Sequence, residues 1–300
     1  MYERLDNCPV CFSENFSNFI ICDDHLVSKE SFAIVRCESC SFLFTNPRPV
    51  LDNISDYYQS EEYISHSNKA GNLVNFVYKI ARSFTLKSKL KLLNGLHPRG
   101  KILDFGTGTG EFLAKCKSDK WDVSGIEPNE SARGQANKLT NGSVVENLNK
   151  LDNDQEFDII TLWHVMEHLP NLNETISNLN YLLSKKGSLI IAVPNCASWD
   201  ARHYKEFWAG YDVPRHFSDF SRQTMGQLLK NNHLSIKNTL PMKLDAYYVS
   251  FLSEKYLSQN HGNSSGVKTY INSLINGWKS NSWASINSLE YSSLIYVVKK

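Results

Sequence analysis

Lys101-Ile-Leu-Asp-Phe-Gly-Thr-Gly-Thr-Gly110 is the stretch that decides the fold, and Glu111-Phe-Leu113 follows it directly. An apolar run ends in an acid, glycines follow at every second position, and a helix-like segment comes next. This order predicts a buried strand, a tight turn and the N-terminus of a helix. The glycines allow positive φ, and without a Cβ they let a ligand lie against the backbone. A dinucleotide loop has its third glycine three residues after the second, where this chain has Glu111, so the spacing indicates another ligand.

A second acid ends the next expected strand. Trp121-Asp-Val-Ser-Gly-Ile-Glu127-Pro128 places a carboxylate seventeen residues after Gly110. Its two oxygens can accept hydrogen bonds from neighbouring ribose hydroxyls. Asp104-x-Gly106-x-Gly108-x-Gly110 together with this acid resembles motif I and the ribose-holding acid of the class I S-adenosylmethionine (SAM) methyltransferases. The resemblance implies a SAM site made of Asp104, Gly106, Thr107, Gly108, Gly110, Glu127, Pro128, Asn147, Leu148, Trp163 and His164.

Strands and helices alternate from residue 101 onwards, which predicts a parallel sheet with right-handed crossovers. We expect strands at 101–105, 122–126, 143–146, 157–162 and 187–193, and two more near 234–240 and 290–298. We expect helices at 72–94, 110–118, 129–139, 171–184, 221–231, 244–257 and 267–278. The fold class is therefore α/β. The family resemblance implies a Rossmann-like, seven-stranded class I methyltransferase sheet.

The exit of the fourth expected strand carries the chemistry. Trp163-His-Val-Met-Glu-His-Leu-Pro170 resembles motif IV of the small-molecule SAM methyltransferases, whose EHL signature lies beside the methyl donor. In one mechanism, His168 or His216 is a general base that takes the proton of an attacking oxygen, nitrogen or carbon. In the other, His164, Glu167, His168 and His216 bind a divalent ion, as the resemblance of HxxEH to the ubiquinone-type and small-RNA 2′-O-methyltransferases implies. The first glutamate of those families is a histidine here, so the sequence favours the metal-free base.

The fifth expected strand opens into residues 195–220, which are dense in aromatic, arginine and histidine side chains. Such an insertion predicts a substrate lid, because flat rings stack on sugars and donors fix hydroxyls. A purely structural aromatic cluster is the alternative.

Cys8-Pro-Val-Cys11 and Cys37-Glu-Ser-Cys40 have the spacing of a four-cysteine zinc ribbon. The glycine that commonly follows each such pair is replaced by Phe12 and Ser41. A structural zinc ion is expected, since an appendage of about fifty residues buries too little apolar surface to hold itself together.

Length and charge set the remaining limits. Three hundred residues suit one α/β domain with an appendage. We expect a zinc-ribbon-like module at 1–50, a helical linker or cap at 51–97 and a methyltransferase domain at 98–300, with a helical insertion at 243–285. The net charge of +1 argues against nucleic acid as the main partner. Apolar runs are short and no signal peptide is visible, so we expect a cytoplasmic protein without a transmembrane segment.

Two known groups combine such a zinc module with a methyltransferase. One is the bacterial sugar C-methyltransferases, whose tyrosine-rich stretch resembles residues 57–66 and implies Tyr63 as a substrate contact. The other is the methyltransferases of cell-surface polysaccharide and secondary metabolism. Together they imply a small-molecule acceptor, such as a sugar or a nucleotide- or lipid-linked glycan precursor. An RNA methyltransferase that grips its substrate with the ribbon and a non-catalytic SAM-binding protein are the alternatives.

Overall fold

The central element is a seven-stranded sheet. The computed structural model describes residues 1–58, 72–151, 155–260, 262 and 266–300, and for residues 72–82 the backbone alone. The sheet has the order β12-β13-β10-β9-β6-β7-β8. Its strands are β6 (Lys101–Phe105), β7 (Asp122–Ile126), β8 (Val144–Val145), β9 (Phe157–Trp163), β10 (Leu183–Pro194), β12 (Ser235–Pro241) and β13 (Ser293–Lys299). Strands β6 to β10 are parallel and β13 is antiparallel to both of its neighbours, which confirms the predicted α/β class.

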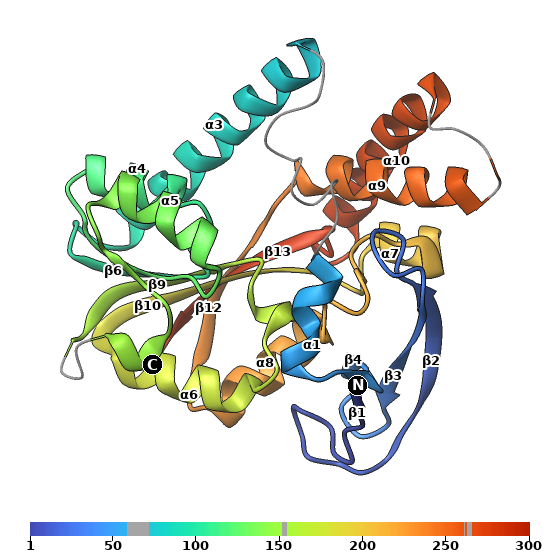
Figure 1. Cartoon of the computed structure of the whole chain (residues 1–300), viewed down its shortest axis with the longest axis horizontal. Coiled ribbons are helices and arrows are strands. Elements are labelled where there is room, and N and C mark those ends of the chain that lie inside the picture. The colour runs from blue at the N-terminus through green and yellow to red at the C-terminus, as the bar shows by residue number, and fades with distance from the viewer. Residues whose placement is uncertain (59–71, 152–154, 261, 263–265) are drawn as a thin grey trace.

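Helices cover both faces of this sheet (Figure 1). On one face lie α4 (Glu111–Ser118), α5 (Glu130–Thr140) and the C-terminal part of α3 (Asn72–Leu96); on the other lie α6 (Leu172–Leu182) and α8 (Arg222–Asn231). Among these five helices, the C-terminal ends of two differ from the predicted ends by two residues. Helix α6 ends earlier, because Leu183 is already the first residue of β10 and pairs with Phe157 of β9. Helix α3 continues past Asn94, whose side chain bonds Asp119 and Trp121 instead of capping the helix.

The N-terminal residues form a second sheet of order β11-β4-β3-β2. Strands β2 (Phe16–Asp23), β3 (Ser31–Cys37) and β4 (Leu43–Thr45) come from the N-terminus, whereas β11 (Ser218–Asp219) comes from the loop after β10. Nearby, β1 (Tyr2–Glu3) pairs with β5 (Arg48–Pro49), and α1 (Leu51–Ile54) and the short helix η1 (Ser55–Tyr58) follow. The loop after β10 thus completes the N-terminal sheet.

The N-terminal sheet also shares its hydrophobic core with the rest of the chain. Phe42 and Phe44 belong to the same buried cluster as residues of α6, α8 and the central sheet. On its other side, Phe32 and Ile34 pack with residues 201–213 of the loop after β10. That loop contains α7 (Trp199–Tyr204) and the short helix η4 (Lys205–Phe207).

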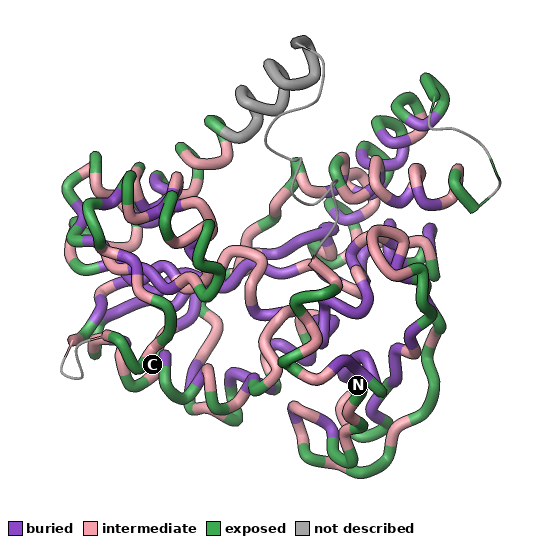
Figure 2. The backbone as a smooth tube through the Cα atoms, viewed as in Figure 1, coloured by how far each residue is buried: buried purple, intermediate pink, exposed green. Residues whose placement is uncertain are grey.

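A helical hairpin, α9 (Asp245–Asn260) and α10 (Val267–Ile286), connects β12 to β13. Helix α10 extends eight residues beyond the predicted end at 278. The hairpin and the N-terminal half of α3 project from the same side of the molecule (Figure 1). Figure 2 shows much of α10 exposed. Among the described residues, no helix has the length and apolarity needed to cross a bilayer.

Candidate active site

The glycine loop joins β6 to α4. Gly106, Gly108 and Gly110 all have positive φ, of 78°, 57° and 84°. A Cβ on Gly110 would lie 2.6 Å from the Cα of Ala136, so only glycine fits between the loop and α5. Around Gly108, by contrast, a Cβ would meet no described atom within 4 Å. The loop therefore presents open backbone at Gly108, where a ligand can approach closely.

Two acids flank this loop. Glu127 accepts hydrogen bonds from the backbone N–H groups of Gly108 (2.8 Å) and Asn129 (2.9 Å), and its carboxylate oxygens have further lone pairs for a ligand. Asp104 is buried and accepts a hydrogen bond from Thr161 Oγ1 at 2.6 Å. Burial raises the pKa of Asp104 to about 7, although the Thr161 hydroxyl and a nearby ammonium group act in the opposite direction.

The other residues expected to bind SAM lie in this loop or at and just after the ends of β7, β8 and β9. Thr107 Oγ1 donates to the carbonyl of Asp104 (2.8 Å), Pro128 follows Glu127 at the end of β7, and Asn147 and Leu148 begin the short helix η2 (Leu148–Lys150). Trp163 ends β9, and its buried indole Nε1 has no hydrogen-bond partner among the described residues.

Lys89 is a residue that the motif analysis does not single out. It comes from α3, and its ammonium lies 4.2 Å from the centroid of the Trp163 ring. Burial lowers the pKa of Lys89. Since α3 lies before the glycine loop and has no motif of its own, only the structure reveals this contact.

His164 lies between two carboxylates. Its Nδ1 is 3.3 Å from Glu167 Oε1, and its Nε2 is 3.1 Å from Asp245 Oδ2. Burial opposes the charged form, but the two carboxylates outweigh it and raise the pKa of His164 to about 10. At neutral pH both ring nitrogens therefore carry protons, and His164 has no lone pair for a metal or a substrate proton. The contact of its Nδ1 with Glu167 helps to hold that carboxylate in place.

Glu167, His168 and His216 form the reactive cluster. Each offers a ligand atom within 4.8 Å of the others. Nδ1 of His168 lies 3.0 Å from the carbonyl of Arg215, and Nδ1 of His216 lies 2.8 Å from that of Gly210. A carbonyl only accepts, so each Nδ1 carries a proton, and in the neutral ring Nε2 then keeps the lone pair.

Charge and burial distinguish the members of this cluster. Burial and the neighbouring His216 lower the pKa of His168 to about 4, so its ring is neutral at pH 7. Burial alone would raise the pKa of Glu167, but the hydrogen bond and charge of His164 lower it. Glu167 Oε2 is buried and has no hydrogen-bond partner among the described residues. The cluster therefore combines one buried carboxylate with two imidazoles, of which that of His168 is neutral.

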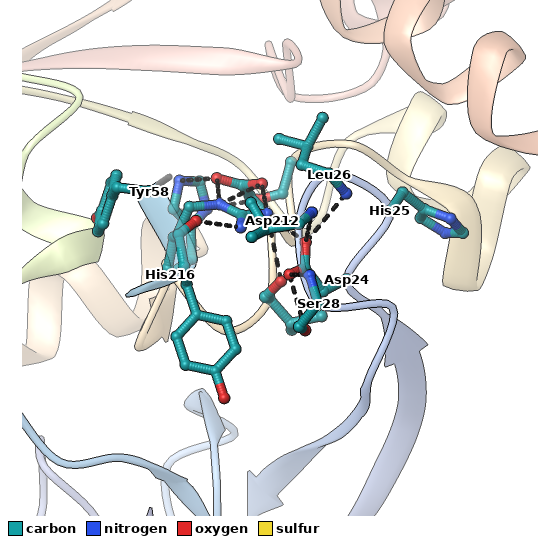
Figure 3. A network of polar contacts seen from close by, with 12 residues as sticks. Asp24, His25, Leu26, Ser28, Tyr58, Asp212 and His216 are labelled. Atoms are coloured by element: carbon teal, nitrogen blue, oxygen red, sulfur yellow. Dashed lines mark hydrogen bonds and ion pairs between the residues drawn. The ribbon is translucent and has the colours of Figure 1, made fainter. Parts of the chain in front are cut away.

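A buried arginine, Arg215, connects this cluster to the residues that follow β2. Figure 3 shows Asp24, Asp212 and His216 in the surrounding network of polar contacts. The Arg215 guanidinium donates to Asp24 Oδ1 (2.9 Å), to Asp212 Oδ1 (2.7 Å) and to the carbonyl of Tyr57 (2.9 Å). The carbonyl of the same arginine accepts the proton of His168 Nδ1. The sequence places Asp212 and Arg215 in an expected lid, but no local pattern links either of them to Asp24.

Hydrogen bonds with Thr45 and Glu167 also hold the backbone of the predicted lid. Thr45 Oγ1 donates to the carbonyl of His216 (2.8 Å), and the N–H of Phe217 donates to the carbonyl of Glu167 (2.8 Å). Tyr63, expected as a substrate contact, lies outside the described residues. Tyr58 has its hydroxyl 3.1 Å from His168 Nδ1.

A cavity of about 540 Å³ opens beside the cluster. Its walls come from α3, the ends of β9 and β10, the loop after β10 and α9. His164, Glu167 and His216 line it, with aromatic rings of α9 opposite: Tyr248, Phe251 and Tyr256. A smaller cavity of about 330 Å³ shares Lys89 and Asp245 with it. The larger cavity, of about 540 Å³, has a volume typical of small-molecule binding sites.

The four cysteines of the two CxxC pairs meet at the far end of the N-terminal sheet. Their sulfur atoms lie within 4.8 Å of one another, with Cys8 and Cys40 3.6 Å apart and Cys11 and Cys37 3.4 Å apart. Phe12 and Ser41 have φ of 62° and 65°, the left-handed region that glycine usually occupies at these positions.

The two cysteine turns have the same hydrogen bond. Phe12 N donates to the carbonyl of Cys8 (3.0 Å), and Ser41 N donates to that of Cys37 (2.9 Å). Both turns thus keep one backbone geometry without glycine.

Comparisons with known proteins find methyltransferases. The chain is 24% identical over 196 residues to the ubiquinone biosynthesis O-methyltransferase of Rickettsia bellii, which is 59% of this chain and 80% of that protein. It is 26% identical over 151 residues to an uncharacterized methyltransferase of Staphylococcus carnosus, which is 49% of this chain and 72% of that protein.

A solved structure shows the same fold. The magnesium protoporphyrin IX methyltransferase of Synechocystis, with bound S-adenosylhomocysteine, has a TM-score of 0.52 and 16% identity over 83% of this chain and 99% of that one. The profile of a family described as a methyltransferase domain matches residues 78–237, which is more than half of the sequence. The chain belongs to this methyltransferase domain family and is a class I SAM-dependent methyltransferase.

Proposed function

We propose that this protein transfers the methyl group of SAM to a hydroxyl oxygen of a small molecule bound in the 540 Å³ cavity. The cluster of Glu167, His168 and His216 carries this proposal, because it lines or adjoins the cavity and offers three ligand atoms close together. The similarity to a ubiquinone biosynthesis O-methyltransferase supports oxygen as the acceptor atom. In the proposed site, Glu127 and the backbone at Gly108 bind the adenosyl part of SAM.

We further propose that the cluster holds a divalent cation. The fit rests on the unpartnered Glu167 Oε2, which a cation would satisfy, and on two imidazoles whose Nδ1 protons are fixed by backbone carbonyls. A bound cation would polarise the acceptor hydroxyl and ease loss of its proton. The structure therefore favours a cation-assisted mechanism, whereas the sequence favours a metal-free base. In the cation-assisted mechanism His164 orients Glu167 without being a metal ligand itself.

The metal-free base is the second candidate. It is favoured by the neutral state of His168 at pH 7 and by the lone pair on its Nε2. In that mechanism His168 accepts the hydroxyl proton as the oxygen attacks the methyl group, and the protein otherwise contributes orientation.

Metal analysis separates the two mechanisms. A Cys8→Ser/Cys11→Ser variant removes ligands of the cysteine cluster, so any divalent ion that remains bound must lie elsewhere. We expect one such ion per chain, lost in His216→Ala and kept in His203→Ala, because His203 is exposed on α7. Methyl transfer that is unaffected by a chelator, with no second ion, would favour the base and overturn the cation.

The acceptor class is proposed more narrowly as a sugar or a nucleotide- or lipid-linked sugar. Aromatic residues on the α9 wall of the cavity support this, since flat rings stack on sugar faces. Methyl-labelled SAM and a panel of free, nucleotide-linked and lipid-linked sugars would test the proposal by mass spectrometry. Labelling of phenolic acceptors alone would exclude the sugar class.

The four cysteines are proposed to bind one structural zinc ion. Four sulfurs this close, on two turns of equal geometry, fit the tetrahedral ligand set of zinc. The ion would fasten the two turns to each other and so hold β2–β4 in place beside the edge strand β11. Zinc content of one per chain in the His216→Ala variant, falling to none when Cys8 and Cys11 are also replaced, is the expected result.

A further inference from the structure

Helix α10 is inverted, in that its polar side chains are buried and its apolar ones are exposed. Its buried residues are Thr269, Ser273, Asn276, Gly277, Ser280 and Ala284. Six large apolar side chains are between 46% and 76% exposed: Val267, Tyr270, Ile271, Leu274, Ile275 and Trp278. A helix on the surface of a monomer has the opposite arrangement, with the apolar stripe facing the core. Most of the outer face of α10 is therefore exposed, and among its six apolar side chains Tyr270 stacks on Phe251 of α9, with ring centroids 5.1 Å apart.

Specific contacts fix the inner face. Asn276 Nδ2 donates to Tyr204 Oη (3.0 Å) and to Glu254 Oε1 (2.9 Å). Ser280 Oγ donates to Asp200 Oδ1 (2.7 Å). A rotation that buried the apolar stripe would leave these buried polar groups without partners, which is costly. The exposed stripe is thus a consequence of how α10 packs.

The composition of this face fits a protein interface. It contains one tryptophan, one tyrosine and four aliphatic residues, and the only charged residues in α10 are Lys268 and Lys279. Aromatic enrichment and few charges are typical of interface cores. A helix that lies on a membrane has a strongly charged polar face, whereas the polar face of α10 is uncharged and buried.

The face is also complementary to itself. When the helix is reversed about the point between Asn272 and Ser273, residue 267 meets 278, 270 meets 275 and 271 meets 274, so each of these six residues meets another of the six. Val267 would face Trp278, a small side chain against a large one, and Ile271 would face Leu274, which is of equal size. A two-fold dimer requires a patch that maps onto itself in this way.

We propose that α10 pairs antiparallel with α10 of a second copy of this chain, forming a two-fold dimer. The area is adequate, since six large side chains, two of them aromatic at about 150–250 Å² each when fully exposed, approach the roughly 800 Å² per subunit of a standard interface. The dimer has a consequence for the cavity, because α10 packs along α9, and α9 supplies one cavity wall. Pairing would hold that wall from behind.

The oligomeric state tests the proposal. Sedimentation velocity of the wild-type protein should give twice the chain mass of 34.2 kDa. Leu274→Glu and Ile271→Lys should each give monomers that keep the wild-type circular dichroism spectrum. Leu139→Glu is the matched control, because Leu139 is 50% exposed on α5 and lies outside the proposed interface; it should stay dimeric.

Mixing the two variants tests the register. In the antiparallel pair Lys at 271 of one chain faces Glu at 274 of the other, so an equimolar mixture should form dimers that neither variant forms alone. A monomeric wild-type protein would overturn the proposal, whether or not it binds lipid vesicles. A dimer that survives Leu274→Glu, or a mixture that stays monomeric, would also overturn it.

Discussion

Asp24→Asn is the substitution that most directly tests how the N-terminal sheet supports the active site. Asp24 is fully buried and its carboxylate accepts from the backbone N–H groups of residues 26–28, from Ser28 Oγ and from Arg215. An asparagine keeps the shape but loses the charge. It also turns one acceptor into a donor, which then faces the N–H of Ser28.

The expected loss of stability is about 3 kcal/mol. Breaking a buried ion pair from one side costs about 3–5 kcal/mol, and the lower end applies because Asp212 still neutralises Arg215. A chain of 300 residues has an unfolding entropy of about 0.63 kcal/mol/K, from about 2.1 cal/mol/K per residue, so the melting temperature should fall by about 5 °C. Burial would raise the pKa of Asp24, but Arg215 and the other donors outweigh it and lower it.

The pH dependence follows from that direction. A lowered carboxyl pKa contributes stability that is present above the unfolded value near 4 and is lost as the pH falls through the folded value. The difference between wild type and Asp24→Asn should therefore be largest at neutral pH and shrink towards pH 3.

Calorimetry against a matched control completes the experiment. Asp23→Asn changes the same side chain one residue earlier, at an exposed site, and should cost less than about 0.5 kcal/mol. The catalytic rate of Asp24→Asn at a temperature where it remains folded should also fall, since Arg215 positions His168. Equal melting temperatures for the two variants would refute the role assigned to Asp24.

Three further predictions concern single sites. Glu127→Ala should weaken SAM binding by about 1.5–3 kcal/mol, the strength of a charge-assisted hydrogen bond; an unchanged dissociation constant in calorimetry would remove Glu127 from the site. Phe12→Gly should raise the melting temperature, because relief of about 1–2 kcal/mol of left-handed strain exceeds the opposing loss of about 0.5–1 kcal/mol from the greater entropy of the unfolded chain; Ser13→Gly should not. In metal-free protein, the NMR titration of His168 should centre near pH 4, and folding stability should fall as the pH drops from 6.5 towards 4.

The sequence predicts the central sheet well because its signals are local. Apolar strands such as 101–105 and 157–162 have buried residues on both faces, and both appear in the structure within one residue of the expected ends. The glycine loop likewise depends on neighbouring residues only. Boundaries move where a tertiary contact intervenes, as at Asn94, whose side chain bonds across to Trp121.

The candidate site is less accessible to sequence analysis. Glu167 and His168 are adjacent in one motif and His216 lies in the histidine-rich loop after β10, so all three can be found by inspection. Asp245 and Lys89, by contrast, come from helices without a motif. Charge pairs of this kind depend on how distant helices pack. The tautomers of the histidines depend on backbone carbonyls, which carry no residue identity at all.

The least predictable feature is the strand β11, and it decides how the molecule should be understood. Two residues, Ser218 and Asp219, have no detectable periodicity, yet they complete the N-terminal sheet by pairing with Phe44 and Leu43. His216 lies two residues before this strand, and its carbonyl accepts a hydrogen bond from Thr45. The cysteine-containing sheet is therefore not a separate appendage, because it is paired with a strand of the loop after β10. It supplies the edge against which the loop with His216 is built.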